Sequence, residues 1–154
     1  MAEHPERIES AVVSYLQGLP PGTWNQTILD DTTGNIRIFS GESEQDKTGQ
    51  CIICRVDGNM GDEDPPFSNN RWCDFVIELH TPIIQEDINQ DWMDAHKSNA
   101  TAIEGAILVD TFESSISNSG LLCYKAINRQ PIREQTENYW VSGYRFRLYS
   151  ALLN

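Results

Sequence analysis

Cys51 and Cys54 are separated by two residues, a spacing that is typical of metal or redox chemistry. They lie within Gln50–Val56, a run rich in β-branched residues that predicts a strand. Residues three apart on a strand point to opposite faces, so the two sulfurs should diverge. No second pair of this kind completes a zinc site, and a thioredoxin-like site would need a helix N-terminus. We therefore expect buried, reduced thiols, with no metal and no cofactor.

Asp74, Glu78 and His80 bring two carboxylates and an imidazole to one face of a second predicted strand, Trp72–Thr81. Alternate residues on a strand are about 6–7 Å apart, so Asp74 and Glu78 should lie about 13 Å apart, too far to share a proton. This favours a solvated or interface face over a catalytic one. His96 falls on the apolar stripe of a predicted helix and is interpreted as a core or boundary histidine. Because no known catalytic motif occurs, we predict that the chain is not an enzyme.

Two polar stretches are interpreted as loops, Glu42–Gly49 and Asp57–Asn70. The second carries oxygen ligands that suit calcium, but Gly61 occupies the fifth position, where the EF-hand pattern places a ligand. Both loops are long for hairpin connections, and we expect them to become ordered on contact with a partner. Together with two arginines of the last strand, they supply the candidate partner surface: Glu42, Glu44, Asp46, Asp62, Glu63, Asp64, Arg145 and Arg147.

The elements that position these residues follow helical and strand periodicities. Helices are predicted over Ile8–Leu19, opened by Pro5, and over Asp91–Leu108; Asp110–Ile116 either continues the second helix or forms a short separate one. Strands are predicted over Asn35–Phe39, Cys51–Val56, Trp72–Thr81, Leu121–Ile127 and Tyr139–Ala151.

This order predicts a single α+β domain over residues 1–154. Its sheet should be a mostly antiparallel meander of four to five strands, with the two main helices packed on one face. The opposite face should carry the polar residues Asp74, Glu78, His80, Arg145 and Arg147.

Charge is unevenly distributed along the chain, whose net charge is −12. Residues 1–110 hold six basic and twenty acidic side chains, whereas residues 111–154 hold five basic and three acidic ones. The acidic excess argues against ordinary nucleic-acid binding, which uses Lys and Arg to displace counterions from phosphates. It also allows the acidic part of one copy to meet the basic end of another, because complementary charge steers association.

Apolar stretches long enough to cross a bilayer, roughly 20 residues, are missing from the sequence. The N-terminal residues include acids and a proline, and no apolar segment of a secretory signal follows them. We therefore expect folding in a cytoplasm, with no membrane partner.

Four features follow one another along the chain. They are the amphipathic helix Ile8–Leu19, the strands ending at Arg37–Gly41 and spanning Cys51–Val56, the alternating strand Trp72–Leu79 with a helix near His96, and Gln130-Pro131-Ile132 before the aromatic strand Tyr139–Tyr149. In this order the chain resembles the tail terminator and tail completion proteins of long-tailed bacteriophages, also called minor tail or neck proteins. The resemblance covers nearly the whole chain and rests on element order, because these families have no invariant chemical motif.

The resemblance implies a structural virion protein of the tail or neck, assembled in the host cytoplasm. Such a subunit forms a ring, commonly a homo-hexamer, at the head-proximal end of the tail tube. The ring ends tube growth and joins the tail tube protein to the head connector or head-completion protein. DNA passes through its lumen without specific binding, and an acidic lumen would keep phosphates from sticking.

Three other functions are compatible with the sequence. A head-closure or connector component of the same particle would differ only in which surface meets which partner. A non-viral ligand-binding α+β domain would need a concave apolar pocket with a few convergent polar groups. A small hydrolase would use Asp74, Glu78 or His80, and alanine at each position should then abolish its activity.

Overall fold

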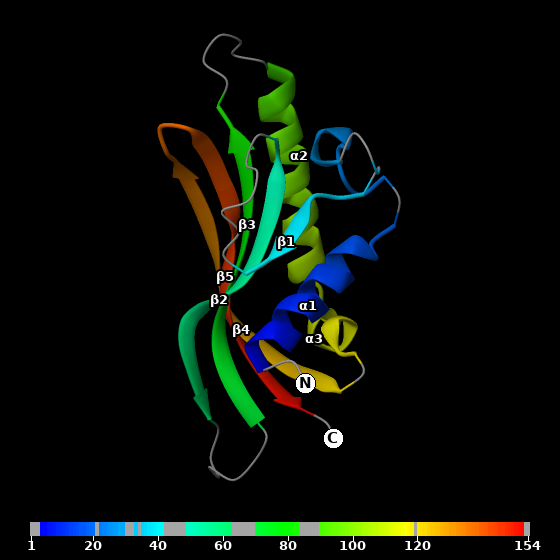
Figure 1. The fold of residues 1–154 in the computed structure, drawn as a ribbon, viewed down its shortest axis with the longest axis vertical. Coiled ribbons are helices and arrows are strands. Elements are labelled where there is room, and N and C mark those ends of the chain that lie inside the picture. The colour runs from blue at the N-terminus through cyan, green and yellow to red at the C-terminus, as the bar shows by residue number, and fades with distance from the viewer. Residues whose placement is uncertain are drawn as a thin grey trace.

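A twisted five-stranded sheet forms the body of the domain, and the helices α1, α2 and α3 lie on one of its faces (Figure 1). The structure, a computed structural model, describes residues 4–20, 22–29, 33, 35–41, 49–62, 70–83, 90–118 and 120–152. The α+β class and the packing of both main helices on one face are confirmed. The elements are α1 (His4–Gln17), a short 3-10 helix (Gln26–Ile28), β1 (Ile38–Ser40), β2 (Cys51–Asp62), β3 (Asn70–Pro82), α2 (Gln90–Ile107), α3 (Phe112–Ile116), β4 (Leu121–Gln135) and β5 (Tyr139–Leu152).

The strand order is β1-β2-β3-β5-β4, so the predicted meander is wrong in two places. β1 runs parallel to β2, and β3 pairs with β5 rather than with β4. Between β3 and β4, the chain passes through α2 and α3, and β5 then returns between β3 and β4. An edge position suits β4 because Pro131 has no N–H for a second ladder. A central position suits β5 because Phe146 and Leu148 are fully buried.

Alternation along β3 is confirmed and fixes which face meets the helices. Cys73, Phe75, Ile77 and Leu79 all belong to the buried core. The Phe146 ring lies 5.6 Å from the rings of both Phe75 and Phe112, measured between centroids, which joins β3, β5 and α3. Rings at this separation stabilise one another beyond the burial of their area. The helices complete this core with their apolar stripes: Ile8, Val12 and Leu16 from α1, and Ile103 and Ile107 from α2.

β2 and β4 are both longer than the sequence predicts, because each continues through a bulge. In β2, residues Asp57–Asp62 belong to the strand, so the predicted loop Asp57–Asn70 is wrong at both of its ends. Gly58 takes a positive φ of 75° within the bulge, a conformation that glycine adopts at little cost. In β4, a second bulge with Asn128 at a φ of 58° bends the strand but does not end it.

Part of each edge of the sheet is protected against further strand pairing. β1 has only three residues. On β4, the N–H of Cys123 donates to Ser117 Oγ at 2.9 Å, and the N–H of Ala126 donates to Glu113 Oε1 at 3.1 Å. Short edge strands, covered edges, bulges and edge prolines are recognised devices against strand addition. Contacts with other chains are therefore expected to use faces and recesses of this domain rather than its strand edges.

The four cysteines are buried free thiols, and Cys51 and Cys54 lie on β2 as predicted. Burial raises the pKa of Cys73 and of Cys123 to about 12. Within the part of the chain that the structure describes, no three His, Cys, Asp or Glu side chains are grouped to hold a metal ion. None of the described helices is long and apolar enough to cross a membrane.

Candidate functional site

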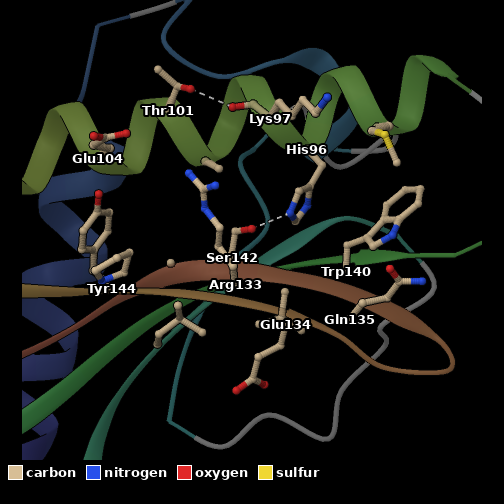
Figure 2. A pocket seen from close by; sticks show the side chains of 16 residues that line it. His96, Lys97, Thr101, Glu104, Arg133, Glu134, Gln135, Trp140, Ser142 and Tyr144 are labelled. Atoms are coloured by element: carbon tan, nitrogen blue, oxygen red, sulfur yellow. Dashed lines mark hydrogen bonds between the residues drawn. The ribbon is translucent and has the colours of Figure 1, made fainter.

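A groove of about 640 Å³ lies between α2 and the β4–β5 hairpin (Figure 2). α2 forms one wall and the two strands form the other. Its volume falls within the range of about 300–1,000 Å³ that is usual for ligand sites. The residues that line it are Met93, His96, Lys97, Ala100, Thr101 and Glu104 from α2, Pro131–Gln135 from β4, and Trp140–Tyr144 from β5.

Strand alternation decides which hairpin side chains face α2. Trp140, Ser142 and Tyr144 point toward the helix, as expected of alternate residues on β5 (Figure 2). Arg133 is the direct cross-strand partner of Ser142, so both side chains lie on this face. The His96 ring is 6.2 Å from the Trp140 ring between centroids. The groove floor is therefore a strand surface that carries the hydroxyls of Ser142 and Tyr144 and the guanidinium of Arg133.

A chain of neutral hydrogen bonds runs beneath the groove, and its direction is set at one end by the backbone. The N–H of Asn25 donates to Asn99 Oδ1 at 2.8 Å, which leaves Asn99 Nδ2 to donate to Gln50 Oε1 at 2.5 Å. Gln50 Nε2 then donates to Thr81 Oγ1 at 2.8 Å. Thr81 Oγ1 lies 2.5 Å from Nδ1 of His96. A hydroxyl donates one hydrogen bond and accepts up to two, so Thr81 can either donate to Nδ1 or accept from it.

Both tautomers of a neutral His96 ring fit this chain of hydrogen bonds. Nε2 of the ring lies 2.9 Å from Ser142 Oγ. Burial, with a smaller contribution from His80, lowers the pKa of His96 to about 4, so the ring is neutral at pH 7. The ring lies between the hydroxyls of Thr81 and Ser142, and its Nδ1 contacts a threonine where a serine triad has a carboxylate. The interpretation of His96 as a core or boundary histidine is confirmed by its 8% exposure.

The Ser142 hydroxyl, which contacts His96, lines the groove. Two exposed cations accompany it, Lys97 on α2 and Arg133 on β4, and the Arg133 guanidinium rises toward the helix (Figure 2). Among the described residues, neither cation forms an ion pair within 4.0 Å. The nearby Glu104 accepts a hydrogen bond from the Tyr144 hydroxyl, whose pKa is raised by burial and by this carboxylate. The middle of the groove is thus rich in donors, which suits an acceptor such as a carboxylate.

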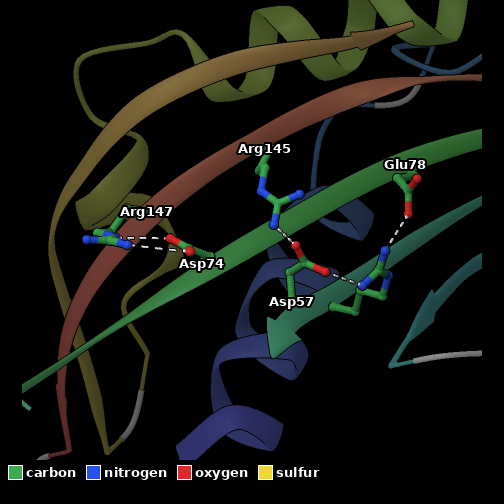
Figure 3. A network of polar contacts seen from close by, with 6 residues as sticks. Asp57, Asp74, Glu78, Arg145 and Arg147 are labelled. Atoms are coloured by element: carbon green, nitrogen blue, oxygen red, sulfur yellow. Dashed lines mark hydrogen bonds and ion pairs between the residues drawn. The ribbon is translucent and has the colours of Figure 1, made fainter. Parts of the chain in front are cut away.

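The opposite face of the sheet carries a network of matched charges (Figure 3). Arg55 binds Asp57 at 2.8 Å and Glu78 at 3.3 Å, and Arg145 forms an ion pair with the same Asp57. Arg147 binds Asp74 at 3.0 Å, and its guanidinium carbon lies 3.9 Å from the centre of the Trp72 ring. This hydrogen bond to Asp74 raises the pKa of Arg147. Each arginine of this face already holds a carboxylate of its own chain.

The predicted partner residues divide into three groups. Arg145 and Arg147 lie on the polar face, as expected, together with Asp74, Glu78 and His80. Asp62 ends β2, opposite Arg71. The remaining candidates, Glu42, Glu44, Asp46, Glu63 and Asp64, lie outside the described residues. The structure therefore brings the two arginines together with Asp57 and Asp74 of the same chain.

Sequence reasoning did not single out the groove residues Ser142, Arg133 and Lys97, or the buried Gln50, Thr81 and Asn99. One signal was available for Thr81, which continues the buried alternation of β3 but carries a hydroxyl. A buried hydroxyl needs a hydrogen-bond partner, so polar residues at core positions point to a network. Nothing in the sequence pairs Arg133 with Ser142, because that contact depends on the register of β4 against β5.

Comparison with known proteins adds no family assignment. The chain matches no protein-family model and no curated protein sequence.

Proposed function

We propose that this chain is a structural subunit of the phage tail terminator type. It assembles into a ring, commonly of six copies, at the head-proximal end of a tail tube and ends tube growth. The ring offers the surface on which the head connector or head-completion protein docks. The place of action is the tail or neck of the virion, after assembly in the host cytoplasm, and the chain performs no catalysis.

The observation that carries this proposal is the order of elements. An N-terminal helix, three strands, a second main helix and two closing strands follow one another, the order on which the resemblance rests. The aromatic final strand occupies the centre of the sheet, next to the alternating strand β3. Fold alone does not specify function, so the surfaces must carry the rest of the argument.

Two surface properties support assembly through faces. The protected edges β1 and β4 discourage open-ended strand addition, which would give fibres rather than a closed ring. A closed ring requires heterologous contacts, in which one patch meets a different patch on the neighbour. The donor-rich groove is one such patch, and it is unlike the rest of this strongly acidic chain.

The charge pattern also fits passage of DNA through a ring. The arginines of the polar face are matched by Asp57, Glu78 and Asp74, so they do not make that face a strong phosphate-binding surface. With a net charge of −12, a lumen lined by this chain would repel phosphates.

Electron microscopy of the concentrated, negatively stained protein tests this proposal. We expect closed rings of uniform diameter with a central opening. Open filaments, or only particles of single-chain size, would count against it. A second test adds the protein to growing tail tubes of its own virus, where tube length should stop increasing.

The groove supports a second candidate, the ligand-binding domain. Its volume and its few convergent polar groups, Ser142, Arg133 and Lys97, meet the criterion that separates this class from the others. A rise of the melting temperature with small carboxylates or phosphates, lost in R133M, would favour this function if the protein also stays monomeric.

A further inference from the structure

The groove brings together two cations that form no ion pair among the described residues, Lys97 and Arg133. Arg7 on α1 and Lys125 on β4 also form none among these residues, but they lie outside the groove. Arg55, Arg129, Arg145 and Arg147 each bind a carboxylate of the chain. Lys97 and Arg133 do not, among the described residues, although acidic residues outnumber basic ones about two to one in this chain. Cations that a chain leaves unpaired on the wall of a recess are available to an external anion.

A polar side chain and two aromatic rings lie beside these cations. Ser142 and Arg133 are cross-strand neighbours, and Trp140 and Tyr144 flank Ser142 on the same face of β5 (Figure 2). Two cations beside a hydroxyl and flanking aromatic rings match an extended acidic peptide.

We propose that this groove binds an acidic segment of a second copy, the stretch Asp62-Glu63-Asp64-Pro65-Pro66. This stretch has three consecutive acidic residues, and the two prolines favour an extended backbone that suits a groove between a helix and a strand. The proposal rests on the proposed function, since it names the contact that would join neighbouring copies of the ring.

Register along β3 places Asp62, with which this segment begins, far from the groove of its own chain. Asp62 lies opposite Arg71, whereas Ser142 lies opposite Leu79. The step of eight residues from Arg71 to Leu79 spans about 26 Å at the usual rise of a strand. The contact that we propose is therefore with another copy. Because the groove and the acidic segment are different patches, this contact is heterologous, as a ring requires.

Photocrosslinking of the full-length protein tests the contact. The photoreactive residue p-benzoylphenylalanine replaces Thr101, an exposed residue of the α2 wall, and normal and 15N-labelled copies are mixed. We expect crosslinks between copies that mass spectrometry maps to a peptide containing residues 62–64. Crosslinks to another segment, crosslinks within one copy only, or none at all would overturn the proposal. Capture of only the tail tube protein, in a mixture with tubes, would also overturn it.

Charge reversal gives the matched controls. K97E/R133E should lower the yield of this crosslink about tenfold, equivalent to roughly 1.4 kcal/mol of binding. A partner copy carrying D62K/E63K/D64K should restore it, because the charges are then exchanged. R7E/K125E makes the same change of charge on α1 and β4 outside the groove, at cations that form no ion pair among the described residues, and should leave the yield unchanged. An unchanged yield of this crosslink in K97E/R133E would contradict the proposal.

Different results would reject the groove contact and the terminator proposal. Rings that persist in K97E/R133E, with no groove crosslinks, leave the terminator proposal standing and reject this contact. A wild-type protein that forms no ring, alone or on tail tubes, rejects the terminator proposal itself.

Discussion

The two sides of the sheet treat their polar groups in different ways. On the polar face, Arg55, Arg145 and Arg147 all hold carboxylates of the same chain (Figure 3). On the helix side, the groove keeps a satisfied neutral chain in its floor but carries two cations with no ion pair among the described residues (Figure 2). The arginines of the polar face find their carboxylates within one chain. The cations of the groove would find theirs only on another molecule.

This difference changes how the charge pattern of the sequence is understood. The acidic part and the basic end of the chain do meet, but they do so within one copy, because β5 lies directly beside β3. Arg145 and Arg147 are already paired with carboxylates of their own chain, which weakens the hypothesis that they attract the acidic part of a neighbour. Binding of a partner at this face stays a prediction. Polar groups matched within the chain should contribute to stability, whereas unmatched ones should contribute to assembly.

The buried neutral chain should show the largest effect on stability. Gln50 is fully buried and is hydrogen-bonded to Thr81, Asn99 and Thr27. We expect Q50L to lower the free energy of unfolding by about 3 kcal/mol, because it leaves buried partners unsatisfied. Urea denaturation followed by circular dichroism measures this loss. Q17L, at an exposed position of α1, is the matched control and should change stability by less than about 0.5 kcal/mol.

The pH dependence of stability should report His96. Its pKa is about 4 in the folded protein, below the ordinary 6.5. Between these values the unfolded chain binds a proton that the folded chain excludes, so stability falls as the pH drops from 6.5 to about 4. We expect a loss of about 2 kcal/mol, reduced from the full shift by partial solvent screening. In H96Q, this fall in the free energy of unfolding between pH 6.5 and about 4 should disappear. An unchanged dependence on pH would contradict a buried neutral His96 ring.

The polar face should show a smaller effect. We expect R55M to lower the free energy of unfolding by about 1 kcal/mol, because Glu78 loses its partner while Asp57 keeps Arg145. The loss should shrink at high salt, which urea titrations with and without added sodium chloride can measure. An equal loss at both salt concentrations would indicate packing of the arginine stem instead of charge.

The groove cations should show the smallest effect on stability. We expect K97M and R133M to change the free energy of unfolding by less than about 0.5 kcal/mol, as exposed charges without an internal partner. Thermal unfolding of the monomer at low concentration is the measurement. A loss as large as that of R55M would mean that these cations serve the fold and would remove the distinction between the two regions.

Much of the fold was predictable because it follows from periodicity. The alternation of Cys73, Phe75, Ile77 and Leu79 defined the core face, and the stripe with Ile103 and Ile107 defined α2. Strand order was not predictable in the same way, because it depends on where the long crossover through α2 and α3 returns. The central place of β5 is a property of the whole sheet.

The groove was less predictable than the fold. Arg133 lies beyond the bulge at Asn128, in a part of β4 where Pro131 argues against a strand in the sequence. The sequence therefore predicted a strand only as far as Ile127, and it gave no reason to pair Arg133 with Ser142. The polar face was easier to foresee, because Asp74 and Arg147 each stand in a clear alternation.

The measurement that tests the central claim most directly is the mass of the purified protein by light scattering coupled to size exclusion, over a concentration series at low and high salt. The account predicts a closed species near six times the chain mass of 17.5 kDa, which dissociates at about 1 M salt because charged contacts are then screened. A protein that stays at a single chain mass up to about 1 mM, where any contact is weaker than roughly 4 kcal/mol, and that also forms no ring when tail tubes are added, would contradict it. A two-fold dimer that grows no further would contradict it as well, because such a contact uses the same patch twice.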